Sequence, residues 1–269
     1  MKGNIIAIAY ALGLATFFTS CEKPEGALYA GEANKVSFFN ANASLNMEGG
    51  SISVPLGRTS TSGELSVPLT LTADGDGYTD VFVVAGAVMF ADGQGKGYAT
   101  VNYGDFSAID PSTLSVSAVG LDVNVGLAFP ITLSVDEGMT SPSAIGEVDV
   151  LASNQLEFES IGEATLNSIE GWWGEEYQVE VHKAVGANVY KLISPFEFNN
   201  FAFMIKSDGV TVICPNQVVY NHSTYGPVTM GGVTGSVVDG KVVLNVTGYT
   251  VSAGSFGGGT EIITLPDTE

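Results

Sequence analysis

Two adjacent tryptophans carry the clearest binding chemistry in this sequence. Trp172 and Trp173 lie in the segment Glu170-Gly-Trp-Trp-Gly-Glu-Glu-Tyr177, between carboxylates and a tyrosine. An indole face stacks on the apolar face of a sugar ring, and nearby carboxylates accept hydrogen bonds from sugar hydroxyls. Trp172, Trp173 and Tyr177 are therefore candidate ligand-binding residues. Adjacent residues of a strand point to opposite faces, so the alternative is that one indole packs in the core and the other covers a sheet edge.

Three aspartates form a second candidate site, for calcium. Asp74, Asp76 and Asp80 occupy positions 1, 3 and 7 of Asp-Gly-Asp-Gly-Tyr-Thr-Asp. Ca²⁺ takes about six to eight oxygen ligands, several of them from carboxylates in one flexible loop. The bidentate glutamate that an EF-hand loop places at position 12 is Ala85 here, so that motif fails. An Asp/Gly hairpin turn on an acidic surface is the alternative interpretation.

No other residues form a catalytic pattern. His182 and His222 are forty residues apart, without a metal-ligand partner at short spacing. Cys214 alternates with Val210 and Val212, as a small buried hydrophobe does. We therefore expect a protein that is not an enzyme and that needs no cofactor, with calcium at the three aspartates as the alternative. Paired carboxylates for glycoside hydrolysis stay open, because the chain has many acidic residues and no motif singles any of them out.

The charge balance excludes nucleic acid as a partner. The 269 residues include 9 basic and 29 acidic side chains, a net charge of −20. Nucleic-acid binding requires Lys and Arg to replace the counterions of the phosphates. Two cysteines are also too few for a disulfide scaffold.

The N-terminus reads as a secretory signal that ends at a cysteine. Met1-Lys2-Gly3-Asn4 precedes an apolar run from Ile5 to Phe18, which is too short for a membrane-spanning helix. The following Thr-Ser-Cys21 resembles a bacterial lipobox, in the looser Phe-Thr-Ser-Cys form of Bacteroidetes lipoproteins. The resemblance implies that Cys21 is lipidated and that the chain is anchored to the outer membrane or cell surface, facing the periplasm or the exterior. We expect a signal peptide over 1–20 and a lipidated cysteine with a tether over 21–35.

From Val36 onward the sequence predicts strands. Apolar residues alternate with polar ones in runs of five to seven, as at Ile52, Val54 and Leu56, which is typical of half-buried strands of antiparallel sheets. Asp-Gly pairs such as Asp208-Gly209 and Asp239-Gly240 mark hairpin turns. The spacing of the strands favours an all-β protein of sandwich type.

A turn-rich segment near residues 137–156 divides the mature chain. Glu137-Gly-Met-Thr-Ser-Pro-Ser143 is rich in turn formers, and both tryptophans and both histidines follow it. We expect one β-sandwich over 36–152 and a second antiparallel β domain over 153–269, with Ser153-Asn-Gln as the linker.

The first domain resembles the Calx-β family. The resemblance rests on Ser51-Ile-Ser-Val-Pro-Leu-Gly-Arg-Thr, Val88-Met-Phe-Ala-Asp-Gly-Gln and Phe129-Pro-Ile-Thr-Leu-Ser-Val-Asp-Glu. It implies an immunoglobulin-like sandwich over about residues 36–137, and some members of the family bind calcium through acidic loops. Residues 156–269 are similar to a β domain that often closes Bacteroidetes surface lipoproteins. Tyr177-Gln-Val-Glu-Val and the final Phe256-Gly carry this second resemblance.

These observations favour a lipid-anchored, non-catalytic surface protein that binds a glycan or another protein. A structural or adhesion component of an extracellular assembly is the alternative, and a carboxylate-dependent hydrolase is a third, less favoured one.

Overall fold

The structure is a computed structural model that describes residues 34–47 and 49–267. The expected signal peptide, Cys21 and most of the tether lie outside the described residues. Within the described part, no helix has the length and apolar character that crossing a membrane requires.

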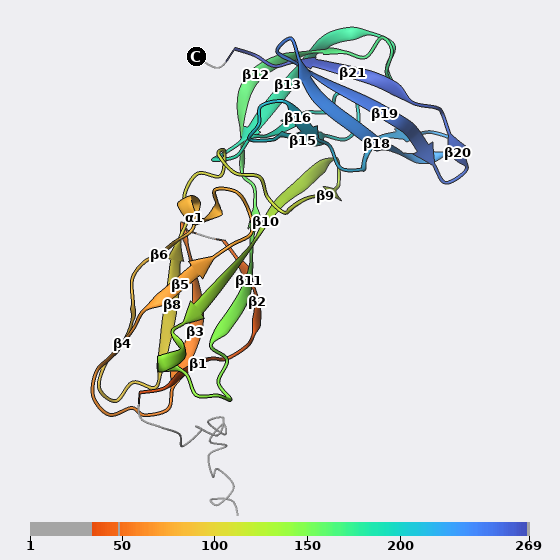
Figure 1. The fold of residues 1–269 in the computed structure, drawn as a ribbon. Coiled ribbons are helices and arrows are strands. Elements are labelled where there is room, and N and C mark those ends of the chain that lie inside the picture. Colours follow the sequence, from red (N-terminus) through yellow and green to blue (C-terminus); the bar gives the residue numbers. More distant parts are fainter. Residues whose placement is uncertain (1–33, 48, 268–269) are drawn as a thin grey trace, which may run out of the picture.

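The first half of the described chain is a β-sandwich of two main sheets (Figure 1). One sheet has the order β1 (Val36–Phe38), β3 (Ser51–Arg58), β8 (Lys96–Asn102) and β6 (Val83–Val84). The other has the order β2 (Asn42–Asn46), β11 (Glu147–Gln155), β10 (Asp122–Val135) and β5 (Leu69–Thr72), and β9 (Thr113–Val119) also pairs with β10. A small ribbon joins β4 (Leu65–Val67) to β7 (Val88–Phe90), and the helices are α1 (Tyr78–Val81) and the 3₁₀ turn η1 (Glu137–Met139).

Alternating apolar residues build the core of this sandwich. In β3 the side chains of Ile52, Val54 and Leu56 are buried, while their neighbours are exposed or half-buried. Phe129 on the facing sheet is fully buried and contacts the rings of Tyr78 and Phe82. The burial pattern therefore follows the period of two that the sequence shows.

Arg58, the single arginine of the chain, lies at the end of β3 and is almost fully buried. Its guanidinium donates hydrogen bonds to backbone carbonyls of two loops, which are those of Thr61, Gly63, Ala91 and Gln94, at 2.6–2.9 Å. The fork of N–H donors suits several acceptors at once. Arg58 thus ties the loop after β3 to the turn after β7.

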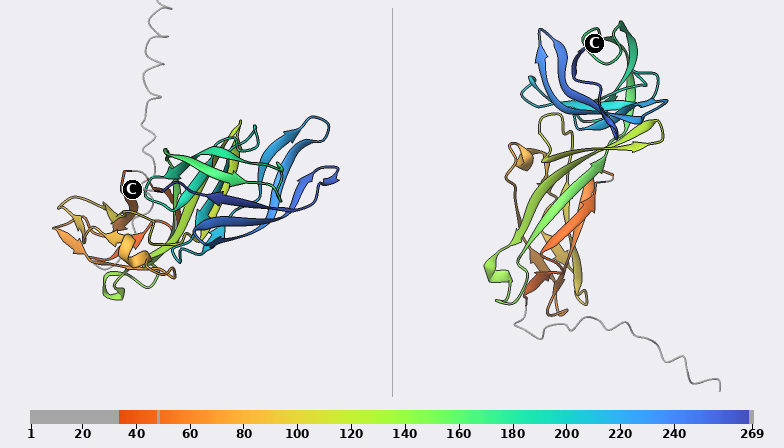
Figure 2. Two further views of the ribbon diagram at one scale, coloured as in Figure 1. Left: turned by 90° about the horizontal axis from the view of Figure 1, so that it is seen from above. Right: turned by 90° about the vertical axis from the view of Figure 1, so that its right-hand side faces the viewer.

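The second half of the described chain is a closed ring of antiparallel strands (Figure 2). The ring has the order β18 (Gly226–Val238), β16 (Thr211–Ile213), β15 (Phe201–Ile205), β14 (Val189–Leu192), β13 (Glu176–Ala184), β12 (Phe158–Asn167), β21 (Gly259–Thr264) and β19 (Lys241–Val251). Pairing of β18 with β19 closes it, and β17 (Gln217–His222) and β20 (Gly254–Ser255) extend its ends. The expected all-β fold, an immunoglobulin-like sandwich followed by a second antiparallel β domain, is confirmed.

The prediction that residues 153–155 form a linker is wrong. Ser153, Asn154 and Gln155 complete β11 and pair with Ala128, Leu127 and Gly126 of β10. Polar side chains there suggest a loop, but strand β10 supplies a partner for their backbone groups. The chain passes between the two halves only at Leu156 and Glu157.

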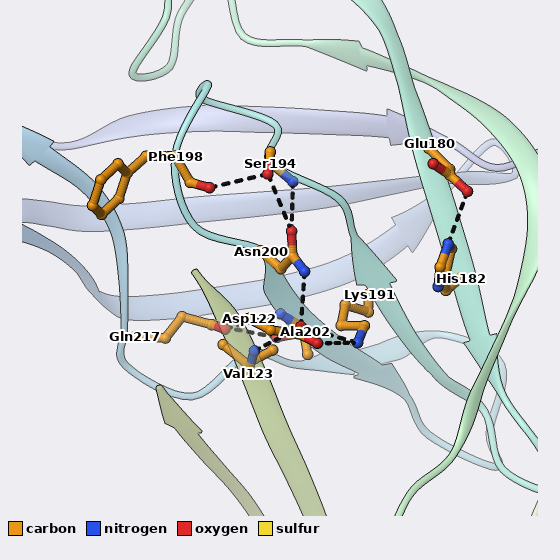
Figure 3. A network of polar contacts seen from close by, with 10 residues as sticks. All are labelled: Asp122, Val123, Glu180, His182, Lys191, Ser194, Phe198, Asn200, Ala202 and Gln217. Atoms are coloured by element: carbon orange, nitrogen blue, oxygen red, sulfur yellow. Dashed lines mark hydrogen bonds and ion pairs between the residues drawn. The ribbon is translucent and has the colours of Figure 1, made fainter. Parts of the chain in front are cut away.

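Several direct contacts join the sandwich to the ring (Figure 3). The Asp122 carboxylate accepts hydrogen bonds from Lys191 Nζ at 3.0 Å and from Asn200 Nδ2 at 2.7 Å. Asp110 forms an ion pair with Lys206 at 3.2 Å and accepts a hydrogen bond from the Ser207 amide. The apolar core of the sandwich also continues into the ring, through Ala184, Ala187, Val189, Ala202 and Met204. The contacts fix the orientation of the two halves at more than one point.

Candidate functional site

Trp172 and Trp173 lie in the loop between β12 and β13, not on a strand. The Trp172 amide donates to Glu261 Oε1 at 2.7 Å, and the Trp173 amide donates to Ser168 Oγ at 2.8 Å. Because the loop is irregular, the two rings do not point to opposite faces. Both contact Tyr220, with ring centroids 5.8 and 5.9 Å away. The strand-based argument that at most one indole is available therefore does not hold.

The two indoles belong to a connected group of rings, which we call the aromatic patch. Its members are Trp172, Trp173, Phe198, Tyr220, His222, Tyr225 and Phe256. Phe256 lies 5.3 Å from Trp172 and 5.4 Å from the His222 ring, between centroids. Tyr225 and Phe256 are 48% and 46% exposed, and both indoles are half-buried. Side chains from four segments thus offer one apolar surface to solvent.

A buried carboxyl group supports the patch from below. Glu261 is fully buried, and its Oε1 also accepts a hydrogen bond from Tyr249 at 2.6 Å, while the Tyr249 ring packs 5.0 Å from Trp172. Burial raises the pKa of Glu261, although bonds from Tyr249 and the Trp172 amide favour the charged form. The Ser168 hydroxyl also favours the charged form of Glu261. Among the described residues, however, Glu261 Oε2 has no hydrogen-bond partner. Gly171 is required here, because a Cβ on it would come within 2.2 Å of Glu261.

Tyr177 does not join the aromatic patch. It lines an adjoining groove of about 410 Å³, which shares Trp173 with the patch and is also lined by Glu175 and Glu197. Its hydroxyl donates a hydrogen bond to the Pro195 carbonyl, and burial, followed by the charge of Glu261, raises its pKa. Tyr177 therefore holds the loop after β14 in place, and of the three candidate residues only Trp172 and Trp173 meet in the patch.

The structure does not bring Asp74, Asp76 and Asp80 together as calcium ligands. Across residues 34–47 and 49–267, no three His, Cys, Asp or Glu side chains gather closely enough to hold a metal ion. The Tyr78 ring fills the middle of this loop, since a Cβ on Gly75 would meet it at 2.3 Å, and the Tyr78 hydroxyl donates to the Asp110 carbonyl. The buried Tyr78 side chain therefore packs against the backbone of this loop.

Sequence reasoning missed most of the aromatic patch. Tyr220, His222 and Tyr225 surround the turn between β17 and β18, and Phe256 follows β20, so they are about 50 to 80 residues from the tryptophans. The one signal was composition, since aromatic residues are frequent in this half of the chain. Closure of the ring by β18 and β19 brings these loops beside the β12–β13 loop.

No protein-family model and no curated protein matches this chain. Among solved structures, CBD12 from CALX1.2 aligns over 82% of this chain and 83% of its own, with 10% identity and a TM-score of 0.30. A protein of unknown function from Bacteroides ovatus aligns over 87% and 94%, with 10% identity and a TM-score of 0.34. An auxiliary nutrient binding protein from Bacteroides thetaiotaomicron VPI-5482 aligns over 83% and 89%, with 10% identity and a TM-score of 0.30. Likenesses of this strength carry no argument about the function of this chain.

Proposed function

We propose that this protein is a lipid-anchored, non-catalytic surface protein that binds glycans through its aromatic patch. The observation that carries the proposal is the unbroken set of ring contacts from Tyr225 through Phe256 to Trp172 and Tyr220. Ring faces that reach solvent on one surface suit the apolar faces of successive sugar residues. Tyrosine hydroxyls and the imidazole of His222 supply hydrogen-bonding groups at the same surface.

The surroundings of the buried Glu261 carboxyl group favour a binding role over catalysis. Glu261 lies under the indoles, but Tyr249 and the Trp172 amide already occupy its Oε1. It is also covered completely, so a substrate does not reach it. Acid catalysis on a glycosidic bond requires a carboxyl group within hydrogen-bond reach of the leaving oxygen.

The test is a glycan screen of the wild-type protein and of Trp172→Ala and Trp173→Ala. Covering about 80 Å² of indole stabilises a complex by roughly 2 kcal/mol, which is about thirtyfold in affinity. We expect such a loss for at least one tryptophan variant. Glu170→Ala, Glu175→Ala and Glu176→Ala serve as controls, because solvent screens these rim carboxylates and their loss matters little.

The thermal midpoint of each variant distinguishes binding from folding. A variant that keeps its midpoint and loses binding supports the proposal. If both tryptophan variants unfold, the pair acts as core, and the exposed residues Tyr225 and Phe256 then become the test, through Tyr225→Ala and Phe256→Ala. Self-association of the wild-type protein without any glycan binding would favour an adhesion role instead.

The proposed anchor is tested separately. Cys21→Ser removes the thiol that a lipid would modify, and two or more acyl chains are needed for stable attachment to a bilayer. We expect the variant in the soluble fraction and the unchanged protein with the membranes. A variant that still partitions wholly with the membranes contradicts lipidation at Cys21.

A further inference from the structure

A cleft of about 630 Å³ lies at the end of the sandwich that faces the ring, apart from the aromatic patch. Strands β2, β10 and β11 and the segment after β8 form its sandwich side, and Glu157 and Val185 reach it from the other half of the chain. Its volume is within the range of about 300–1,000 Å³ that holds small ligands. The cleft therefore has the size and the position, between two units, of a binding site.

Two side-chain amides in this cleft have no hydrogen-bond partner among the described residues. Asn154 and Gln155 line it with Asn46, Ser115 and Ser153. Asn46 and Ser153 contact each other at 3.5 Å, and the Ser115 hydroxyl donates to the Gly126 carbonyl. The amides of Asn154 and Gln155 each offer two donors and an acceptor that nothing in the described chain uses.

Gly126 keeps the floor of the cleft open. It lies inside β10 and pairs with Gln155 on one side and Ser115 on the other. A Cβ at this position would come within 2.9 Å of Ser115 Oγ and 3.2 Å of Gln155 Nε2. Glycine weakens the middle of a strand, and it is found there where another group approaches the backbone closely.

We propose that this cleft binds a neutral saccharide of one or two residues. Among the described residues no lysine or arginine lines it, and Glu157 is the one charged lining residue, so an anionic ligand finds no counter-charge there. Amide and hydroxyl groups both donate and accept, which matches sugar hydroxyls. Val185, which is exposed, adds apolar surface for the C–H face of a sugar ring. This site is separate from the aromatic patch and extends the proposed function to a second place on the molecule.

The test uses nuclear magnetic resonance of the full-length chain with maltose, cellobiose and lactose as probes. The side-chain NH₂ signals of Asn154 and Gln155 report on the cleft directly. We expect saturable shifts of these signals with at least one disaccharide, and smaller or no shifts with glucuronate, because of Glu157. The variants Asn154→Ala and Gln155→Ala each remove the hydrogen bonds of one amide, so each weakens binding about tenfold.

Two control variants separate this site from others. Asn124→Ala alters an exposed amide on the same strand, two residues from Gly126 and outside the cleft, and Trp172→Ala alters only the aromatic patch. Both keep cleft binding if the proposal is right. Absence of shifts with every probe at millimolar concentration overturns it, and so does binding that survives in the Asn154→Ala, Gln155→Ala double variant. If Trp172→Ala loses glycan binding at the aromatic patch but keeps binding in the cleft, the result supports two separate sites.

Discussion

The Asp122 carboxylate meets the ammonium group of Lys191 across the junction of the two halves, at 3.0 and 3.2 Å from its two oxygens. Lys191 is 7% exposed, and its Nζ also lies 4.7 Å above the Phe158 ring. A nearly buried ammonium group is costly unless it is paired. The pair therefore joins the sandwich to the closed ring of strands. Lys191 needs this contact, because its ammonium group is nearly buried.

Loss of this contact should loosen the junction. Asp122→Ala leaves Lys191 without its partner and removes the hydrogen bond from Asn200. We expect a loss of about 1–2 kcal/mol in the free energy of unfolding, because Asp122 is itself partly exposed. Cleavage after the exposed Glu157 by a glutamate-specific protease should become faster. Glu64→Ala, on an exposed loop of the sandwich, is the control, and equal cleavage of both variants would contradict the prediction.

The same contact predicts a dependence on acid. Burial alone would raise the pKa of Asp122, but hydrogen bonds from Asn200, the Val123 amide and Lys191 outweigh it and lower the pKa below 3.8. A carboxyl group with a lowered pKa contributes stability above its unfolded pKa, and that stability is lost as the pH falls through the folded pKa. Urea titrations should therefore show the gap between the protein and Asp122→Ala closing below about pH 4.

Glu261→Gln should respond to pH in the opposite direction. Because burial raises the pKa of Glu261, its stabilising effect is complete below the ordinary value near 4.5 and is lost as the pH rises through the raised pKa. Glutamine keeps an acceptor for Tyr249 and the Trp172 amide and does not ionise. We expect the free energy of unfolding of the variant to rise relative to the unchanged protein as the pH increases above about 4.5. A difference that stays constant as the pH rises would show that folding does not raise the pKa of Glu261.

Arg58→Lys tests the buried clamp of the sandwich. Lysine has three donors on a single nitrogen, so it does not reach the four carbonyl oxygens that Arg58 binds. Each buried carbonyl without a partner costs about 1–3 kcal/mol. We expect a loss of about 2–4 kcal/mol, measured by urea unfolding. The exchange Lys241→Arg at the exposed start of β19 should change stability by less than about 0.5 kcal/mol.

Cys214 should resist alkylation while the protein is folded. Burial raises the pKa of its thiol to about 12, so roughly one thiol in ten thousand is ionised at pH 8. Iodoacetamide labelling of the Cys21→Ser chain, followed by mass spectrometry, should be slow in buffer and fast in urea. Fast labelling in buffer would show that the segment between β16 and β17, which carries Cys214, opens readily.

The strands could be predicted from sequence because their signal is local. Phe201–Ile205 and the alternation at Ile52, Val54 and Leu56 appear as β15 and β3 in the structure. The extent of the aromatic patch could not be predicted from sequence. Phe256 and Tyr220 reach Trp172 only because β18 pairs with β19 and closes the ring of strands. Glu261 was likewise hidden, because it reads as one polar residue of an alternating strand, and only the structure shows that it faces inward.

The described chain begins at the end of the sandwich far from the ring, whereas β20, beside Phe256, lies at the far side of the ring (Figure 1). A protein held to a membrane at Cys21 would carry the patch outward on a stiff arm. Neighbouring copies in the same membrane would then present their patches at a similar height. If the patch binds glycans as we propose, a long polysaccharide would meet several of them at once, and each further contact would form at a high effective concentration. Weak binding by one patch would then be enough for firm retention of a polymer by a crowded surface.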